Sequence, residues 1–256
     1  MKIYSKIYGQ GNSNRLIILH GLFGMGDNWA TLARQWATHS DLEVHLPDMP
    51  NHGRSYKTNR FNYESMSADI IEYVESKTLA PTHILGHSMG GKTAMKIATL
   101  RPELISKLIV VDIAPRYYPV HHMPIIQALQ SLDLSTENRT DIENQLSECI
   151  SQPDIRMFLL KSLHRTSKGF EFRFNLEVIA EQIEEVGKAL PFGAVYYGPT
   201  LFIRGSRSDY ILENDFDHIK THFPDARIET VENTGHWVHA EQPEKVFNLV
   251  AEFLSE

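Results

Sequence analysis

Ser88 stands in a pattern whose residue types and spacing fit nucleophilic catalysis. The pentapeptide Gly86-His87-Ser88-Met89-Gly90 follows an apolar run and opens a stretch of small residues at helical spacing. A G-x-S-x-G pattern between a strand and a helix is typical of a nucleophile elbow, a sharp turn that exposes the serine hydroxyl. Glycine is needed at 86 and 90 because side chains there would collide with the neighbouring strand and helix. A chance turn in an ordinary α/β protein is the alternative interpretation.

His236 is the best candidate for the base that a serine nucleophile requires. It lies in a Gly-His loop between the last expected strand and the last helix, so we expect it at the same sheet edge as Ser88. Two carboxylates, Asp112 and Asp209, follow strands and keep the order Ser, Asp, His. We favour Asp112, which ends a fully apolar strand, and keep Asp209 as the alternative, although it also reads as a turn residue or helix cap.

Backbone N–H groups at two turns are expected to form an oxyanion hole, which needs two aimed donors. One is the N–H of Met89, directly after the nucleophile. The other comes from the turn His20-Gly21-Leu22-Phe23-Gly24. We favour the N–H of Leu22, with that of Phe23 second. Phe23 and Trp237 adjoin these positions, and they either line a substrate pocket or fill core.

The elements that must position these residues alternate between strands and helices. Such a rhythm predicts an α/β fold with a mainly parallel sheet and helices on both faces. Strands are expected at 3–8, 16–19, 42–46, 82–87, 107–113, 200–205 and 227–231. Between about 114 and 197 the pattern shows helical stripes and no convincing buried strand. We therefore expect an α/β core at 1–114 and 198–256, with a helical insertion at 115–197.

Composition excludes several classes of function. The 256 residues carry a formal net charge of −7, which argues against nucleic-acid binding. We find no apolar stretch of about 20 residues and no signal peptide, so we expect no membrane association and a cytoplasmic location. Cys149 is the one cysteine, and its spacing with Ile142 and Leu146 predicts a core position.

Two polar groups leave alternatives open. His121-His122 suggests a metal, but a solvated pair is favoured because no further ligand has convincing spacing. We therefore expect no metal and no cofactor. Four basic residues of the 115–197 block could receive a phosphate-bearing thioester or could simply be solvated: Arg116, Lys161, Arg165 and Lys168.

Taken together, these motifs resemble the α/β-hydrolase superfamily over essentially the whole chain. Within it they resemble the YbfF-like bacterial esterases and the abhydrolase-domain-containing 11 group, through the segments 20–24, 48–55, 86–92, 111–115 and 235–241. In that group the triad acid lies on an Asp-Ile-Ala-Pro motif, which here is Asp112 to Pro115. The resemblance implies a serine carboxylesterase or acyl-thioesterase acting on small or medium acyl groups, with the 115–197 block as a cap.

We therefore expect Ser88, His236 and Asp112 to form a triad that hydrolyses a small-molecule ester or thioester through an acyl-enzyme. A carbon–carbon bond hydrolase using the same triad is one alternative. A non-catalytic ligand-binding protein on a hydrolase fold is another. The substrate and the oligomeric state remain open from the sequence.

Overall fold

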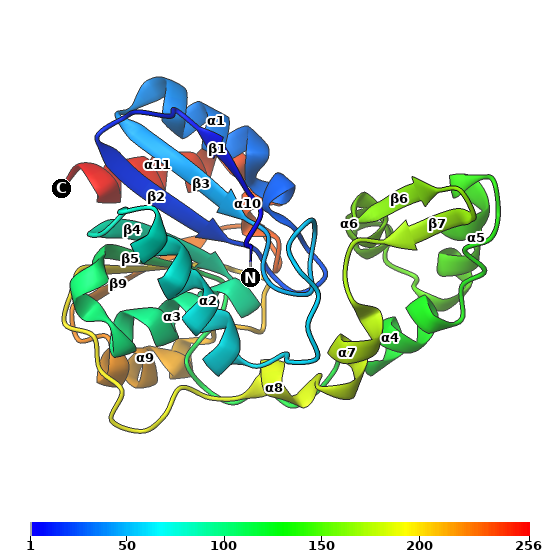
Figure 1. The fold of residues 1–256 in the computed structure, drawn as a ribbon. Helices are drawn as coiled ribbons and strands as arrows, with labels where there is room; N and C mark the ends of the chain where they lie inside the picture. Colours follow the sequence, from blue (N-terminus) through cyan, green and yellow to red (C-terminus); the bar gives the residue numbers. More distant parts are fainter. Residues whose placement is uncertain (1) are drawn as a thin grey trace.

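A seven-stranded sheet forms the centre of the computed structural model, which describes residues 2–256 (Figure 1). The strand order is β1-β3-β2-β4-β5-β8-β9, with β1 antiparallel to β3 and every other pair parallel. The strands are β1 Ser5–Tyr8, β2 Asn14–Leu19, β3 Leu42–Pro47, β4 Thr82–His87, β5 Ile105–Val111, β8 Thr200–Gly205 and β9 Ala226–Val231. This arrangement confirms the predicted α/β class.

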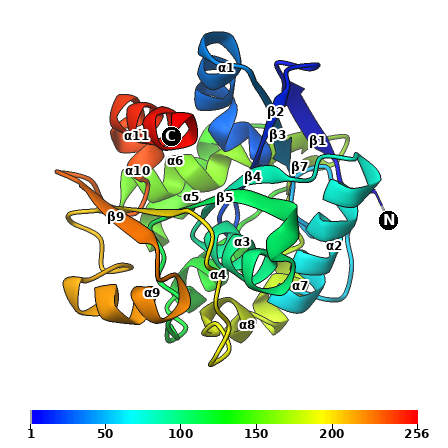
Figure 2. The ribbon, with the colours of Figure 1, turned by 90° about the vertical axis from the view of Figure 1, so that its left-hand side faces the viewer.

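Helices cover both faces of this sheet, as the alternating pattern predicts (Figure 2). Successive side chains of β2 point to opposite faces of the sheet. Leu16 and Ile18 pack in the cluster with helices α1 and α11, whereas Ile17 and Leu19 pack in the opposite cluster with α2, α3 and α9. The bounds of these helices are α1 Ala30–His39, α2 Tyr63–Ser76, α3 Met89–Leu100, α9 Phe216–His222 and α11 Pro243–Ser255, and the short α10 covers Val238–Glu241. Short 3-10 helices cover Gly26–Trp29, Pro102–Leu104 and Glu213–Asp215.

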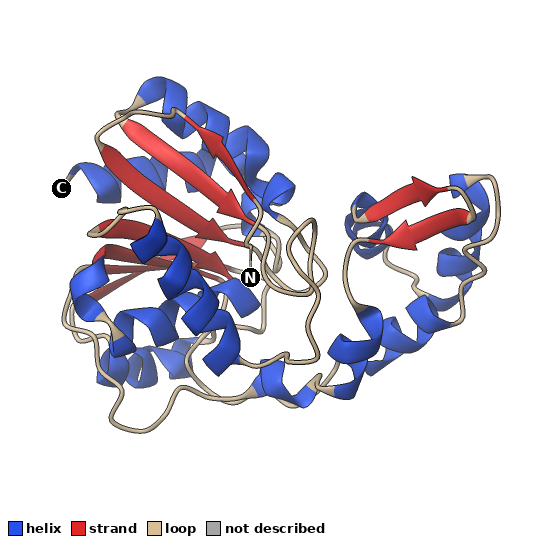
Figure 3. Cartoon of the chain, in the orientation of Figure 1, coloured by secondary structure: helices blue, strands red, loops and turns tan. Residues whose placement is uncertain are grey.

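The chain between β5 and β8 lies to one side of the sheet, beyond its carboxyl edge (Figure 1). It contains five helices and also a two-stranded antiparallel hairpin, which the sequence pattern did not predict (Figure 3). The elements are α4 Met123–Gln130, α5 Arg139–Cys149, α6 Pro153–Lys161, β6 Leu163–Thr166, β7 Gly169–Phe172, α7 Leu176–Glu181 and α8 Glu184–Gly187. Each hairpin strand has four residues and only Phe172 is buried, too short a pattern to separate from a loop.

The predicted core position of Cys149 is wrong. Its side chain is exposed, while Ile142 and Leu146 of the same helix are fully buried. The buried stripe of α5 continues to Ile150, four residues after Leu146, and Cys149 falls beside it.

The carboxyl ends of the parallel strands meet at one edge of the sheet, where ligands bind in open α/β sheets. His20, Ser88 and Asp112 directly follow β2, β4 and β5, and His236 follows β9 after a short loop. Among residues 2–256, no helix is long and apolar enough to cross a membrane.

Candidate active site

Ser88 occupies a strained turn between β4 and α3, at φ 54° and ψ −118°. Residues other than glycine rarely adopt this region, and such strain is concentrated at functional sites. A Cβ added to Gly86 would lie 2.2 Å from the carbonyl oxygen of Gly90, and one added to Gly90 would lie 2.2 Å from that of Leu19. The two glycines therefore allow the close approach of strand and helix that the motif predicts.

Asp112 is fully buried at the end of β5 and its carboxylate has three partners. Oδ1 accepts a 3.0 Å hydrogen bond from the N–H of Gly205, and Oδ2 accepts one from the Ser208 hydroxyl. Oδ2 also lies 2.7 Å from Nδ1 of His236. These donors compensate for the desolvation of a buried carboxylate.

The bond to Asp112 fixes the tautomer of His236. Because an ionised carboxylate can only accept, Nδ1 of His236 carries a proton, and Nε2 is the nitrogen with the free lone pair. His236 and Ser88 line the same cavity. This arrangement leaves Nε2 to act as a base on a hydroxyl in that cavity.

Asp209, the alternative acid, is an exposed residue on the cavity wall. Its backbone carbonyl accepts a hydrogen bond of 3.0 Å from Arg116. The structure thus brings His236 to Asp112 and leaves Asp209 at the surface.

Three histidines lie near His236, of which His87 and His239 are buried and His122 is half-buried. His87 donates from Nε2 to the carbonyl of His236 at 2.9 Å, and its ring centroid lies 4.7 Å from that of His236. His239 is buried and stacks on Trp29, with 4.1 Å between the ring centroids. Burial lowers the pKa of His87 well below its usual range, and lowers the pKa of His239 and of His122 to about 3. These rings are therefore neutral at neutral pH.

The N–H groups of Leu22 and Met89 face no competing acceptor within residues 2–256, since neither donates a hydrogen bond there. The N–H of Phe23, by contrast, lies 3.3 Å from Nε2 of His52 and is engaged. Of the two candidates on this turn, Leu22 is the one with a free donor. Met89 is the first residue of α3, so its N–H also lies at the positive end of that helix.

Two neutral histidines hold the turn that carries Leu22. His20 contacts the carbonyl of Gly21 through Nδ1 at 2.8 Å and accepts from the N–H of Met49 at 2.9 Å. Burial lowers the pKa of His20 to about 4 and that of His52 to about 3. His20 therefore links the turn to the backbone of Met49.

A cavity of about 500 Å³ opens at Ser88. Its lining is largely apolar, and it includes both predicted substrate-contacting residues, Phe23 and Trp237. Phe158 packs against Trp237 with 5.5 Å between ring centroids. The four basic residues considered for a thioester phosphate do not line this cavity, and Arg116 pairs with Asp215 at 2.9 Å instead.

Several cavity residues were not found from the sequence. His121 and His122, interpreted as a solvated pair, line the cavity, and His122 is half-buried. Tyr210 lines it as well. The only sequence signal for these residues was their chemical type, because their positions depend on the path of the chain outside the sheet. Residues 2–256 contain no group of three or more His, Cys, Asp or Glu side chains able to hold a metal.

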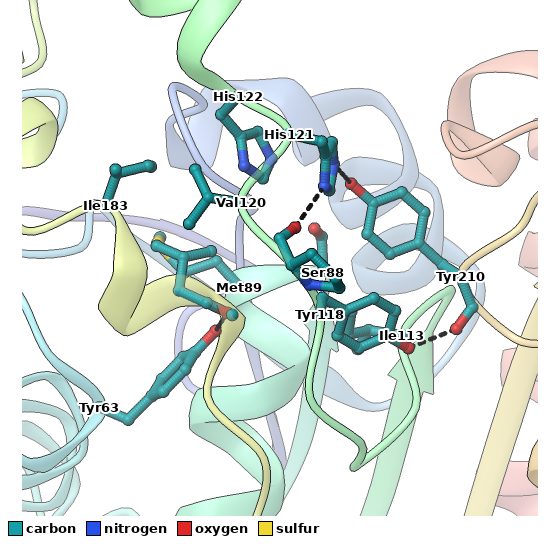
Figure 4. Close-up of a pocket in the computed structure, with 13 residues that line it drawn as sticks. Tyr63, Ser88, Met89, Ile113, Tyr118, Val120, His121, His122, Ile183 and Tyr210 are labelled. Atoms are coloured by element: carbon teal, nitrogen blue, oxygen red, sulfur yellow. Dashed lines mark hydrogen bonds between the residues drawn. The ribbon is translucent and has the colours of Figure 1, made fainter.

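A second cavity, of about 10 Å³, adjoins Ser88 on another side, and its walls include Tyr63, Met89 and Ile183 (Figure 4). That volume is close to the minimum for one water molecule. His121, Tyr210 and Ser88 border both cavities. Ser88 therefore lies between a large cavity and one that is close in volume to a single water molecule.

Comparisons with known proteins agree with this fold. A family model described as the alpha/beta hydrolase fold matches residues 14–143. The chain is 34% identical over 259 residues to the sn-1-specific diacylglycerol lipase ABHD11 of Mus musculus, covering 98% of this chain and 84% of the mouse protein. It is 32% identical over 252 residues to Esterase YbfF of Escherichia coli (strain K12), covering 96% of this chain and 95% of that protein.

A solved structure described as a marine microorganism esterase is similar along its whole length. It superposes with a TM-score of 0.94 at 39% sequence identity, covering 98% of this chain and 99% of the esterase.

Proposed function

The chain belongs to the α/β-hydrolase family, and on this premise we propose that it is a serine carboxylic ester hydrolase that works through an acyl-enzyme. The observation that carries the proposal is the pairing of buried Asp112 with His236, which lines one cavity together with the strained Ser88 turn. The esterase and lipase names of the relatives support the same reaction class.

In the proposed mechanism, Ser88 Oγ attacks the acyl carbonyl while Nε2 of His236 takes the hydroxyl proton. Asp112 holds the imidazole in the required tautomer and stabilises its cation. The N–H groups of Leu22 and Met89 stabilise the oxyanion, the leaving group departs with the proton from His236, and water then releases the acyl group by the same steps.

We propose that residues 115–197 form a cap that shapes the substrate pocket. Seven residues of this segment support the idea by lining the large cavity: His121, His122, Ile125, Gln152, Ile155, Phe158 and Leu159. The apolar lining favours an uncharged acyl chain of small or medium length, in an ester or a thioester.

The test is hydrolysis of p-nitrophenyl esters with acyl chains from two to sixteen carbons by wild type and Ser88→Ala. We expect a Ser88-dependent rate that peaks at one chain length, and Ser88-dependent labelling by a fluorophosphonate. Wild-type turnover in Ser88→Ala would refute the mechanism. Labelling without ester hydrolysis would redirect the search to carbon–carbon bond substrates, and absence of both would favour ligand binding without catalysis.

A further inference from the structure

The ring of Tyr210 lies flat against the imidazole of His236. Their centroids are 3.9 Å apart and their planes differ by 20°. Tyr210 follows β8 in the chain and reaches the site from the strand next to Asp112. It therefore covers one face of the ring whose edge faces Asp112.

The side chain of Tyr210 is held by the segment that leads from β5 into residues 115–197. Its hydroxyl lies 2.6 Å from Nε2 of His121, and the two side chains point toward each other (Figure 4). Nδ1 of His121 lies 3.0 Å from the carbonyl of Pro119. Because a carbonyl only accepts, Nδ1 carries the proton and Nε2 accepts from the Tyr210 hydroxyl.

The backbone of Tyr210 is held by the same segment. Its carbonyl accepts a hydrogen bond from the hydroxyl of Tyr118, which in turn accepts one of 2.8 Å from the N–H of Ala114. Burial, together with the charge of Asp112, raises the pKa of Tyr210 to about 12, so its hydroxyl remains a donor at neutral pH. Both ends of this residue are thus fixed by residues 114–121.

We propose that Tyr210 is a positioning residue for His236, and that His121 links it to the entrance of the cap. This inference rests on the proposed function, since it concerns the base of that reaction. His236 becomes a cation when it takes the proton of Ser88, and the negative face of an aromatic ring stabilises a cation more than a neutral ring. A base held by stacking on one face and by Asp112 at one edge also keeps its Nε2 aimed into the cavity.

The first experiment compares Tyr210→Leu with Tyr210→Phe in the pH dependence of kcat/KM for the best p-nitrophenyl ester. Tyr210→Leu should lower kcat roughly threefold to thirtyfold. It should also shift the acid limb of the kcat/KM profile to lower pH by about half a unit or more, because the imidazolium form of His236 is less stable without the ring. Tyr210→Phe keeps the ring and should keep the limb in place. The control is Tyr117→Leu, because Tyr117 is an exposed tyrosine within residues 114–121.

The titratable groups that face His236 allow this profile to be interpreted. Asp112 is its partner, while His87, His122 and His239 have pKa values lowered by burial. His121 and Asp209 also line this cavity, so His121→Ala and Asp209→Asn are measured beside Tyr210→Leu, and an acid limb that both leave in place is assigned to His236. An unchanged limb and an unchanged kcat in a folded Tyr210→Leu protein would overturn the role of the ring. A lower kcat with an unmoved limb would show a merely structural role and would overturn it as well.

A double-mutant cycle tests the link to His121 without relying on Tyr210→Leu to fold. Tyr210→Phe and His121→Ala break the same hydrogen bond, so the double variant should lose no more kcat/KM than the worse single variant. Losses that multiply would overturn the link. If Ser88→Ala kept wild-type activity, the proposed function itself would fail, whereas a dead Ser88→Ala beside an unaffected Tyr210→Leu would remove only this inference.

Discussion

Nδ1 of His236 lies 2.7 Å from Oδ2 of Asp112, although 124 residues separate them in sequence. The pairing arises because β5 and β9 are both parallel strands whose carboxyl ends reach the same edge of the sheet. The N–H of Gly205 and the hydroxyl of Ser208 complete the coordination of the same carboxylate. The loops that follow β8 and β9 therefore both depend on one buried aspartate.

Asp112→Asn should reduce kcat by about 10⁴-fold, because an amide in that place favours the wrong tautomer of His236. Asp209→Asn is the matched control and should retain most activity, since Asp209 is exposed. The measurement is kcat for a p-nitrophenyl ester at pH 8. The reverse ranking of the two variants would assign the acid to Asp209.

Acid should destabilise this protein through its buried neutral histidines. The pKa values of His20 and His52 are lowered from 6.5 to about 4 and about 3, so the unfolded state binds more protons as the pH falls below 6.5. The free energy of unfolding therefore decreases as the pH is lowered, by at most about 1.4 kcal/mol per pH unit for each histidine.

His52→Asn should reduce the loss of unfolding free energy between pH 6.5 and 4. His39→Asn, at an exposed position, should not. Urea unfolding at several pH values measures the slope. Equal slopes for wild type and His52→Asn would contradict the assignment of proton uptake to His52.

The sequence predicted the residues that sit on the sheet better than those outside it. Ser88, Asp112 and His236 follow parallel strands directly or after a short loop, and the alternation of strand-like and helical segments predicted those strands. The parallel topology then brings the ends of these strands to one edge of the sheet. Predicting the strands was therefore enough to predict that the three residues lie close together.

The contacts between Tyr210 and the 115–197 segment had no such signal. His121 and Tyr210 are 89 residues apart, and their contact depends on how an irregular segment crosses the sheet edge. The apolar residues between Leu176 and Val186 fall at helical spacing, yet the structure divides this stretch into α7 and α8 at Gln182 and Ile183. Long-range packing, rather than local propensity, determines this part of the site.

The acyl-chain preference should depend on Phe158. This half-buried side chain of α6 lines the large cavity and packs against Trp237. Phe158→Ala enlarges the cavity, so the optimum of the p-nitrophenyl series should move to longer chains, with kcat/KM for the longer ester rising relative to the shorter one. Met157→Ala, at an exposed neighbouring position, should leave the optimum unchanged. The same shift in both variants would mean that α6 acts through stability rather than through pocket volume.

Lys92 joins the nucleophile helix to both ends of the 115–197 segment. Its side chain, 2% exposed, donates to the carbonyl of Arg116 at 2.6 Å and to that of Lys188 at 2.5 Å. Burial, with the charge of Arg116, lowers the pKa of Lys92 from 10.5 to about 7. Lys92→Met keeps the length of the side chain but leaves two carbonyls without their donor, which should cost about 1–3 kcal/mol in stability.

The pH dependence of that cost distinguishes Lys92 from an ordinary lysine. Between pH 7 and 10.5 the unfolded chain keeps the Lys92 proton while the folded state releases it, so the wild type gains stability as the pH rises and Lys92→Met does not. The difference in Tm between the two proteins should therefore widen from pH 6.5 to pH 9. Lys96 lies on the same helix as Lys92 and forms an ion pair with Glu64 of α2, and Lys96→Met should show a difference that hardly changes over that range. A constant difference for Lys92→Met would mean that Lys92 remains protonated in the folded state, and the two carbonyl contacts would then be made by an ammonium group at every pH tested.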